Sequence, residues 1–328
     1  MMKLNLLLKM TLICTLTVIL LGAFTRLSDA GLGCPDWPGC YGHIKVPSQA
    51  HELAHVERHF PGQEIEPKKA WLEMIHRYVA GSLGILVLLI LIQSWRGSAT
   101  PKKLPGLIAA LIVFQALLGM WTVTMKLMPV VVMSHLLGGF TLFSLLLLLY
   151  LRVRPLQIPD GDPKARTLAP LAMVALAVVV LQIMLGGWTS SNYAALACTE
   201  LPICEGDWSS NLRLADAFSP FQGQHPSFEF GVLDYHTRMT IHIAHRIGAL
   251  LTAIVVLTLA FMLWRRADSS MLKRSALGLT LVLGLQLSLG LANVLLHLPL
   301  PVAVAHNGGA ALLLLTLVFI NYALWRKA

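Results

Sequence analysis

Charged side chains are scarce in this sequence, and their scarcity excludes an ordinary water-soluble domain. Only 12% of the 328 residues are Asp, Glu, Lys or Arg, against about 25% in a typical soluble protein. The hydrophobic share is 56%, which indicates an integral membrane protein. Because few residues precede the first apolar run, we expect no organelle transit peptide. A secretory signal cleaved after "LSDA" is an alternative, although the repeat described below favours retention of this segment.

Eight apolar runs are long enough to cross a bilayer. They lie near residues 10–25, 74–95, 104–125, 130–151, 168–188, 239–264, 275–296 and 302–325. Lipid offers no hydrogen-bond partner to the backbone, so each run should be a helix. We therefore expect an all-α integral membrane protein with eight transmembrane helices.

Acidic residues are fewer than basic ones, 16 against 25. With a cytoplasmic N-terminus, fifteen of the basic residues fall in short cytoplasmic segments beside only three acids, Asp160, Asp162 and Asp268. This asymmetry follows the positive-inside rule and predicts that both termini are cytoplasmic. Long loops near 26–70 and 189–238 would then face outward. The net charge of +9 reflects orientation, so we predict no nucleic-acid partner.

Cysteine is rare as well, with five residues in the chain. Cys34 and Cys40 fall in the first outer loop and Cys198 and Cys204 in the second, with five residues between the members of each pair. Thiols oxidise outside a bacterial membrane, so we predict the disulfides Cys34–Cys40 and Cys198–Cys204. Free thiols or a metal site are the alternatives. Cys14 stands alone within the first span, where we expect it to pack.

The second half of the chain repeats the first. "LGAFTRLSDAGLGCPDWPGC" (21–40) aligns without a gap on "LGGWTSSNYAALACTELPIC" (185–204). The repeat divides the chain into four-helix halves, 1–154 and 168–328, joined by a cytoplasmic linker, 155–167. Since both halves have the same orientation, we expect a pseudo-two-fold axis along the membrane normal.

The stretch "HELAH" (51–55) matches the zinc-protease pattern H-E-x-x-H, with His59 four residues later and His43 nearby. It has no counterpart in the second half, and its polar loop is too short for a protease domain. We interpret it as an amphipathic surface helix. An incidental metal contact by His51, His55 and His59 is the alternative.

Four histidines occupy repeat-related positions, one in each helix that runs from outside to inside: His76, His135, His245 and His306. Each lies roughly one to two turns below the outer surface. Buried ionisable residues in a span are costly and usually functional. Two imidazoles per half could ligate one haem iron from opposite sides. Zinc or copper would more often recruit a third or fourth nitrogen or sulfur ligand.

The residues beside these histidines support the haem hypothesis. Arg77 and Arg246 directly follow two of them and are candidate contacts for haem propionates. Three residues before His76 stands Glu73, where the second half has His242. This difference suggests that one pocket performs chemistry while the other handles electrons. Alternatively, Glu73 only caps the entrance of its helix.

The segments "TRLSDAGLGCPDWPGC", "AWLEMIHR", "SHLLGG", "AHRIGA" and "AHNGG" together resemble the haem A synthases of respiratory bacteria and mitochondria. The resemblance covers nearly the whole chain. It implies oxidation of the C8 methyl group of haem O to a formyl group, giving haem A for terminal oxidases. It maps a haem b cofactor to His245 and His306, the substrate haem to His76 and His135, and the essential acid to Glu73. It also implies a disulfide in each outer loop.

The resemblance implies a bacterial inner-membrane protein with its long loops on the periplasmic side. Expected partners are haem O synthase, terminal oxidase assembly factors and an electron donor or acceptor in the membrane, with a homo-oligomer left open. The chief alternative is a di-haem b electron-transfer subunit like a quinol-oxidising cytochrome b. A transporter with histidine relays is a weaker one. The His-rich insert near 43–66 is longer than the loop of the simplest family members.

Overall fold

The computed structural model describes residues 2–97, 102–155 and 162–325, and within these ranges the chain is helical without a named strand. Eight of the described helices are long and apolar enough to cross a membrane. They are α1 (Met2–Leu27), α3 (Pro67–Arg96), α4 (Lys103–Thr124), α5 (Pro129–Val153), α7 (Ala169–Ser191), α9 (Tyr235–Arg266), α10 (Ser270–Leu295) and α11 (Leu300–Trp325). The predicted all-α protein with eight transmembrane helices is confirmed.

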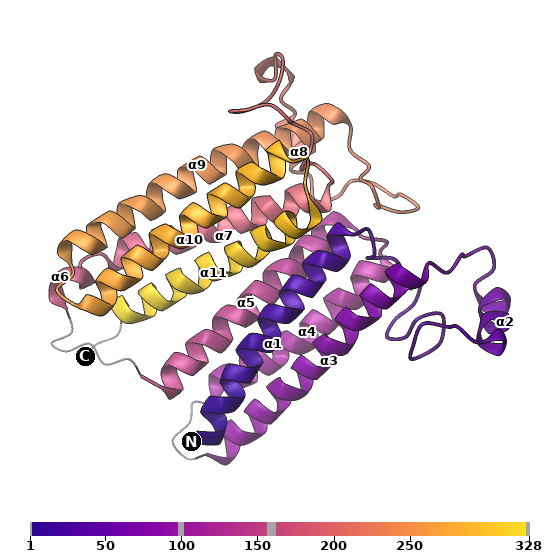
Figure 1. Ribbon diagram of the computed structural model, residues 1–328, viewed down its shortest axis with the longest axis horizontal. Helices are drawn as coiled ribbons and strands as arrows, with labels where there is room; N and C mark the ends of the chain where they lie inside the picture. Colours follow the sequence, from indigo (N-terminus) through magenta and orange to yellow (C-terminus); the bar gives the residue numbers. More distant parts are fainter. Residues whose placement is uncertain (1, 98–101, 156–161, 326–328) are drawn as a thin grey trace.

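The long helices pack in two groups of four (Figure 1). Helices α1, α3, α4 and α5 form one group, and α7, α9, α10 and α11 form the other. The groups meet where α11 packs on α1 and α5, and where α5 packs on α7. The start of α1 and the end of α11 lie at the same end of the molecule (Figure 1). Which membrane side that end faces stays a prediction, as does the pseudo-two-fold axis.

Short elements occupy the connections. The first long loop carries α2 (Ala50–His59), and the second carries the 3-10 turn η2 (Ser209–Asn211) and α8 (Leu214–Ala217). Both loops lie at the end opposite to the start of α1 (Figure 1). In the sequence, α6 (Pro163–Arg166) comes between the two groups, and it packs on α9 and α11 of the second group. Asp160 and residues 156–161 of the predicted linker lie outside the described residues.

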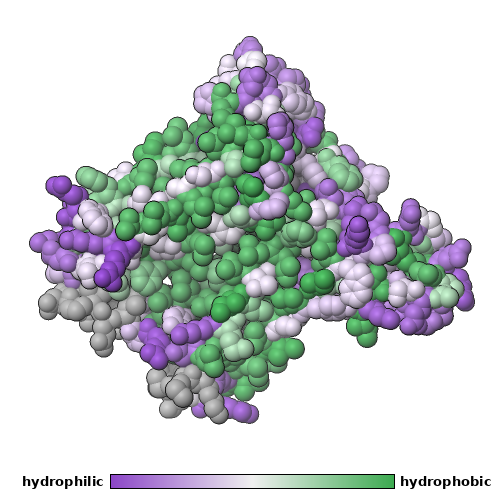
Figure 2. Space-filling model, in the orientation of Figure 1, coloured by the Kyte–Doolittle hydropathy of each residue, from purple (hydrophilic) through white to green (hydrophobic). Residues whose placement is uncertain are grey.

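Each group of helices has its own apolar core. In the first group, leucine and isoleucine side chains from α1, α3, α4 and α5 meet, among them Leu8, Ile90, Ile108 and Leu146. Large apolar side chains also cover the outer faces of the helices, where Ile13, for example, is 69% exposed. Figure 2 shows these apolar surfaces over the helical body and hydrophilic residues toward its ends. So extensive an exposed apolar surface is the surface that a lipid-facing protein requires.

Candidate functional site

The first four-helix group encloses a large cavity of about 1390 Å³. Its wall comes from α1, α3, α4 and α5, with contributions from the first outer loop and from Gly187, Ser190 and Asn307 of the second group. Cavities for drug-sized ligands usually have about 300–1,000 Å³. This cavity therefore has room for a ligand larger than most metabolites.

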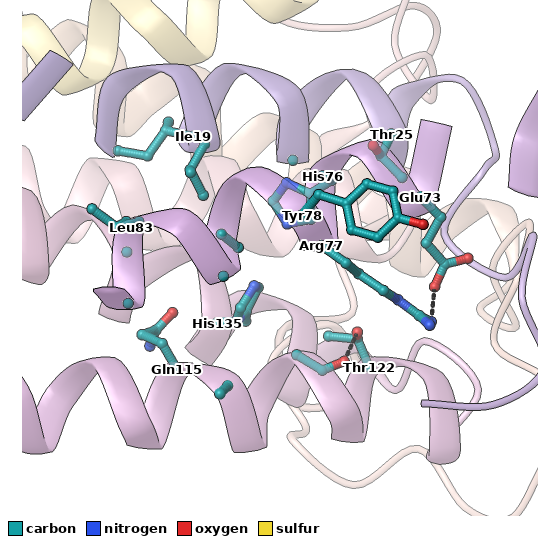
Figure 3. Close-up of a pocket in the computed structure, with 18 of the residues that line it drawn as sticks. Ile19, Thr25, Glu73, His76, Arg77, Tyr78, Leu83, Gln115, Thr122 and His135 are labelled. Carbon is teal, nitrogen blue, oxygen red and sulfur yellow. Dashed lines mark hydrogen bonds and ion pairs between the residues drawn. The ribbon is translucent and has the colours of Figure 1, made fainter. Parts of the chain in front are cut away.

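Two of the predicted ligands, His76 on α3 and His135 on α5, line this cavity (Figure 3). Each ring packs against a glycine on the neighbouring helix. A Cβ placed on Gly22 of α1 would lie 3.0 Å from Cε1 of His76, and one on Gly119 of α4 would lie 3.4 Å from Cε1 of His135. At Gly22 even a Cβ would crowd the His76 ring, whereas at Gly119 a Cβ would just touch the His135 ring and a larger side chain would press against it.

The second group repeats this arrangement. A Cβ on Gly186 of α7 would lie 3.1 Å from Cε1 of His245, and one on Gly290 of α10 would lie 3.1 Å from Cε1 of His306. All four predicted histidines thus rest on a glycine, and we call Gly22, Gly119, Gly186 and Gly290 the glycine seats. The sequence repeat pairs these glycines but gives no sign of the ring contacts.

The hydrogen bonding of the rings differs between the two groups. Nδ1 of His76, His135 and His306 is buried without a hydrogen-bond partner among the described residues. Nδ1 of His245 instead lies 3.0 Å from Nε2 of Gln182. Position 18, which the repeat pairs with Gln182, is a valine. Nε2 of His306 lies 3.3 Å from Nε2 of Gln286, so each histidine of the second group has a glutamine amide beside its ring.

The first cavity fits a porphyrin. Imidazole nitrogens are the usual protein ligands for a six-coordinate haem iron, and His76 and His135 supply two on facing helices. Gly81 and Gly139 also line the cavity, and a Cβ on either would meet nothing within 4 Å. Bare backbone facing open space lets a flat macrocycle approach closely.

Glu73 does not cap its own helix, because α3 begins six residues earlier at Pro67. Its Oε2 accepts a hydrogen bond of 2.9 Å from the backbone N–H of Cys34, and its Oε1 lies 2.5 Å from Nη2 of Arg77 (Figure 3). The side chain is buried and lines the cavity. Its counterpart His242 accepts from the N–H of Cys198 at 3.2 Å through Nδ1. Both residues thus bind the outer loop of their half, but only Glu73 contributes a carboxylate.

The two arginines that follow His76 and His245, Arg77 and Arg246, also bind these loops. Nη1 of Arg77 donates to the carbonyl oxygens of Pro38 and Gly39. Arg246 donates to three carbonyl oxygens of the second loop, those of Cys198, Glu200 and Ile203. In the structure both guanidinium groups therefore donate hydrogen bonds to carbonyl oxygens of the loops. Their predicted contacts with propionates stay a prediction.

Both predicted disulfides are present, Cys34–Cys40 and Cys198–Cys204, and Cys14 is free. The sulfurs of the second pair lie within 4.8 Å of a carboxylate oxygen of Glu205. Because these sulfurs are bonded to each other, they lack the thiolates that a metal site would need. The alternative of a cysteine metal site is therefore wrong for this pair.

The "HELAH" stretch forms α2, as the sequence predicts for an amphipathic surface helix. Oε2 of Glu52 accepts from the backbone N–H groups of Ser48 and Gln49, at 2.8 and 3.0 Å. These N–H groups, with the ammonium of Lys45, lower the pKa of Glu52 to about 2. A carboxylate bound in this way holds the start of the helix and is not free to act as the base of a protease.

The histidines of this loop meet in a different set from the one proposed on sequence. The rings of His55 and His59 stack at 4.0 Å, and His43 from the preceding loop lies 5.2 Å from His55. Burial lowers the pKa of His55, and the nearby His59 and His43 lower it further. His51 is exposed and has no part in these ring contacts.

Replacing Glu52 with alanine should loosen α2 without changing the helix bundle. The N–H groups of Ser48 and Gln49 lose their acceptor, so hydrogen exchange at the start of α2 should speed up several-fold when measured by mass spectrometry. Because the pKa of Glu52 is lowered, its contribution is present at neutral pH and is lost as the pH falls toward 2. Glu57→Ala, at an exposed acid of the same helix, is the control. Equal exchange in the two variants would contradict this account of Glu52.

An eight-helix membrane protein with paired histidines on facing helices, one pair in a cavity of porphyrin size, has the structure of a protein that handles haem. Comparison with known proteins agrees. The model of the COX15-CtaA family, described as cytochrome oxidase assembly protein, matches residues 5–318. The haem A synthase of Shewanella oneidensis is 68% identical over 327 residues, which cover 100% of this chain and 98% of that protein.

More distant relatives bear the same name. The haem A synthase of Rhodospirillum centenum is 28% identical over 90% of this chain and 81% of its own length. That of Rhizorhabdus wittichii is 26% identical over 94% and 90%. The chain belongs to the haem A synthase family, and the family resemblance predicted from sequence is confirmed.

Proposed function

We propose that this protein oxidises the C8 methyl group of haem O to the formyl group of haem A. His76 and His135 would hold the substrate haem, and His245 and His306 would hold a resident haem b. The observation that carries this proposal is the set of four histidines on glycine seats, one pair of which lines a cavity of about 1390 Å³. Family membership supports the same chemistry. A di-haem electron carrier would not need a carboxylate, Glu73, in one half where the other half has the imidazole of His242.

The protein's own part in this reaction would be to position the substrate haem and to enclose it. Haem b, when bound, would supply one-electron transfer beside the substrate. The glycine seats fix the rings of His76 and His135 against α1 and α4, which orients the substrate within the cavity. Glu73 lines the same cavity, where its carboxylate would accept a proton or stabilise positive charge that develops at the reacting carbon.

We place the protein in the bacterial inner membrane, with both termini in the cytoplasm and the disulfide loops in the periplasm. The positive-inside distribution supports this orientation. The halves 1–154 and 168–328 would be the substrate and cofactor halves. Haem O synthase would supply the substrate, terminal oxidase assembly factors would receive the product, and a membrane electron carrier would take the electrons. Self-association is left open.

The test is to express the chain together with haem O synthase in a host without its own haem A pathway, and to extract the pigments. Haem A, or its alcohol precursor, should appear. A host with haem O synthase and the variant His76→Ala is the matched control, in which haem O should persist. Accumulation of haem O alone with the unaltered chain would refute the proposed function.

Valine at a glycine seat should displace the histidine that rests there. Gly186→Val would push a branched side chain into the His245 ring, so the protein should lose most of its bound haem b, measured as Soret absorbance per polypeptide. Gly22→Val should keep that absorbance but lose turnover. Gly278→Val is the control, because a Cβ there meets nothing within 4 Å. Unchanged haem content in Gly186→Val would show that the seat does not position His245.

A further inference from the structure

Arg26 stands where the two helix groups meet, at the end of α1, and it lines the cavity. Its Nη2 donates a hydrogen bond of 3.0 Å to the carbonyl oxygen of Ser190, and its guanidinium carbon lies 4.1 Å from the ring centre of Tyr193. Both contacts are with the second half. Nε is buried and has no hydrogen-bond partner among the described residues. The side chain is therefore held in place but retains an unused donor.

No ion pair to Arg26 occurs within the part of the chain that the structure describes. The other charged groups of the cavity wall are already engaged. Arg77 pairs with Glu73, and Asp36 accepts from the backbone N–H groups of Tyr41 and Gly42. Among the described charged side chains of the cavity wall, Arg26 is therefore the cation without an ion-pair partner. A partly buried guanidinium without one is costly, and a carboxylate ligand would remove that cost.

The position of Arg26 along α1 relates it to the ligand histidines. It follows Gly22, the seat of His76, by four residues, which is one helical turn on the same face. The backbone of Arg26 therefore lies about one turn nearer the loop end of α1 than that of Gly22. A carboxylate on a short chain at the edge of a macrocycle held by His76 would extend into this region.

The repeat makes this cation specific to the first half. Residue 26 aligns with Ser190, the residue whose carbonyl it contacts. The half of the chain with the large cavity thus has an arginine where the other half has a neutral side chain.

We propose that Arg26 is the carboxylate-binding subsite of the substrate cavity and receives a propionate of the porphyrin held by His76 and His135. This inference rests on the proposed function. It gives to Arg26 a role that the sequence had suggested for Arg77, whose donors the structure commits to Glu73 and the loop.

The experiment compares two probes on the full-length protein in detergent: iron protoporphyrin IX, which has two ionised propionates, and its dimethyl ester, which has none. Soret titrations give the Kd of the binding that His76→Ala abolishes. Arg26→Gln should weaken the Kd for the diacid about tenfold or more, as expected for loss of a charge-assisted hydrogen bond. The Kd for the ester should stay unchanged. Arg26→Lys should fall between Arg26→Gln and the unaltered protein, because lysine keeps the charge but not the planar fork.

Lys126→Gln removes an exposed cation from the turn between α4 and α5 and is the charge control. An unchanged Kd for the diacid in Arg26→Gln would overturn the proposal. So would equal weakening for both probes, which would mean that Arg26 only holds the two halves together through Ser190 and Tyr193. If Arg26→Gln does not fold, Arg26→Lys decides by the same comparison of probes. Absence of any His76-dependent binding in the unaltered protein would refute the proposed function itself, a result distinct from the other two.

Discussion

Alanine at His245 or His306 is expected to remove the bis-histidine haem b spectrum and to abolish activity. Loss of one axial ligand leaves the iron five-coordinate and the porphyrin weakly held. The effect should be near complete, because each ring is held against a glycine seat and would supply one of the two axial ligands of its pair. The measurement is the reduced-minus-oxidised spectrum of the purified protein, normalised to polypeptide.

The matched variants are His76→Ala and His135→Ala in the first half. They should keep the haem b spectrum and still abolish conversion of haem O, since they would remove the ligands of a substrate that enters and leaves. The two sets of variants should separate because the histidine pairs are on different helices. The opposite pattern, with haem b lost on removal of His76 and retained on removal of His245, would reverse the assignment of the halves.

Replacing Glu73 with alanine is expected to lower turnover about 10²–10⁴-fold, the usual range for loss of a group that transfers a proton in catalysis. The haem b spectrum should be unaffected, because Glu73 lies in the wall of the first cavity. Pigment extracts of cells with this variant should contain haem O or a partly oxidised intermediate. A di-haem electron carrier would lose almost nothing on this substitution, so full activity would count against the enzyme.

Glu73→Gln separates chemistry from structure at the same position. Its amide oxygen can still accept from the N–H of Cys34, whereas the negative charge that pairs with Arg77 is gone. If the carboxylate acts on the substrate, Glu73→Gln should be as inactive as Glu73→Ala. If Glu73 only holds the disulfide loop, Glu73→Gln should recover most of the activity.

Hydropathy predicts which segments cross the membrane but not where the helices begin. The apolar run that starts near residue 74 belongs to α3, which begins at Pro67. The helix begins before the apolar run and includes Lys68 and Lys69, because the backbone of charged residues also forms helical hydrogen bonds. The start of α9 had a local signal that hydropathy ignores. Asp234 accepts from the backbone N–H of Thr237, as a helix cap does.

The predicted site residues were visible in the sequence because most of them recur in the repeat. Glu73 was visible because it differs from its repeat partner, His242, beside a predicted ligand histidine. Arg26 was missed because its contacts, Ser190 and Tyr193, belong to the other half of the chain. One signal was present: a cation at the end of an apolar run whose repeat partner is neutral. The role of Glu73 as acceptor for Cys34 depends on the path of the loop, which no spacing in the sequence specifies.

The glycine seats also bear on how the two halves could diverge. A ring that packs on bare backbone takes much of its position from the crossing of two helices. The remaining wall is then free to change in volume and charge, as it has at Glu73 and Arg26, while the ring geometry persists. The same independence makes this bundle a tractable scaffold for porphyrin design: vary the wall near Gly81 and Gly139, and leave the four seats alone.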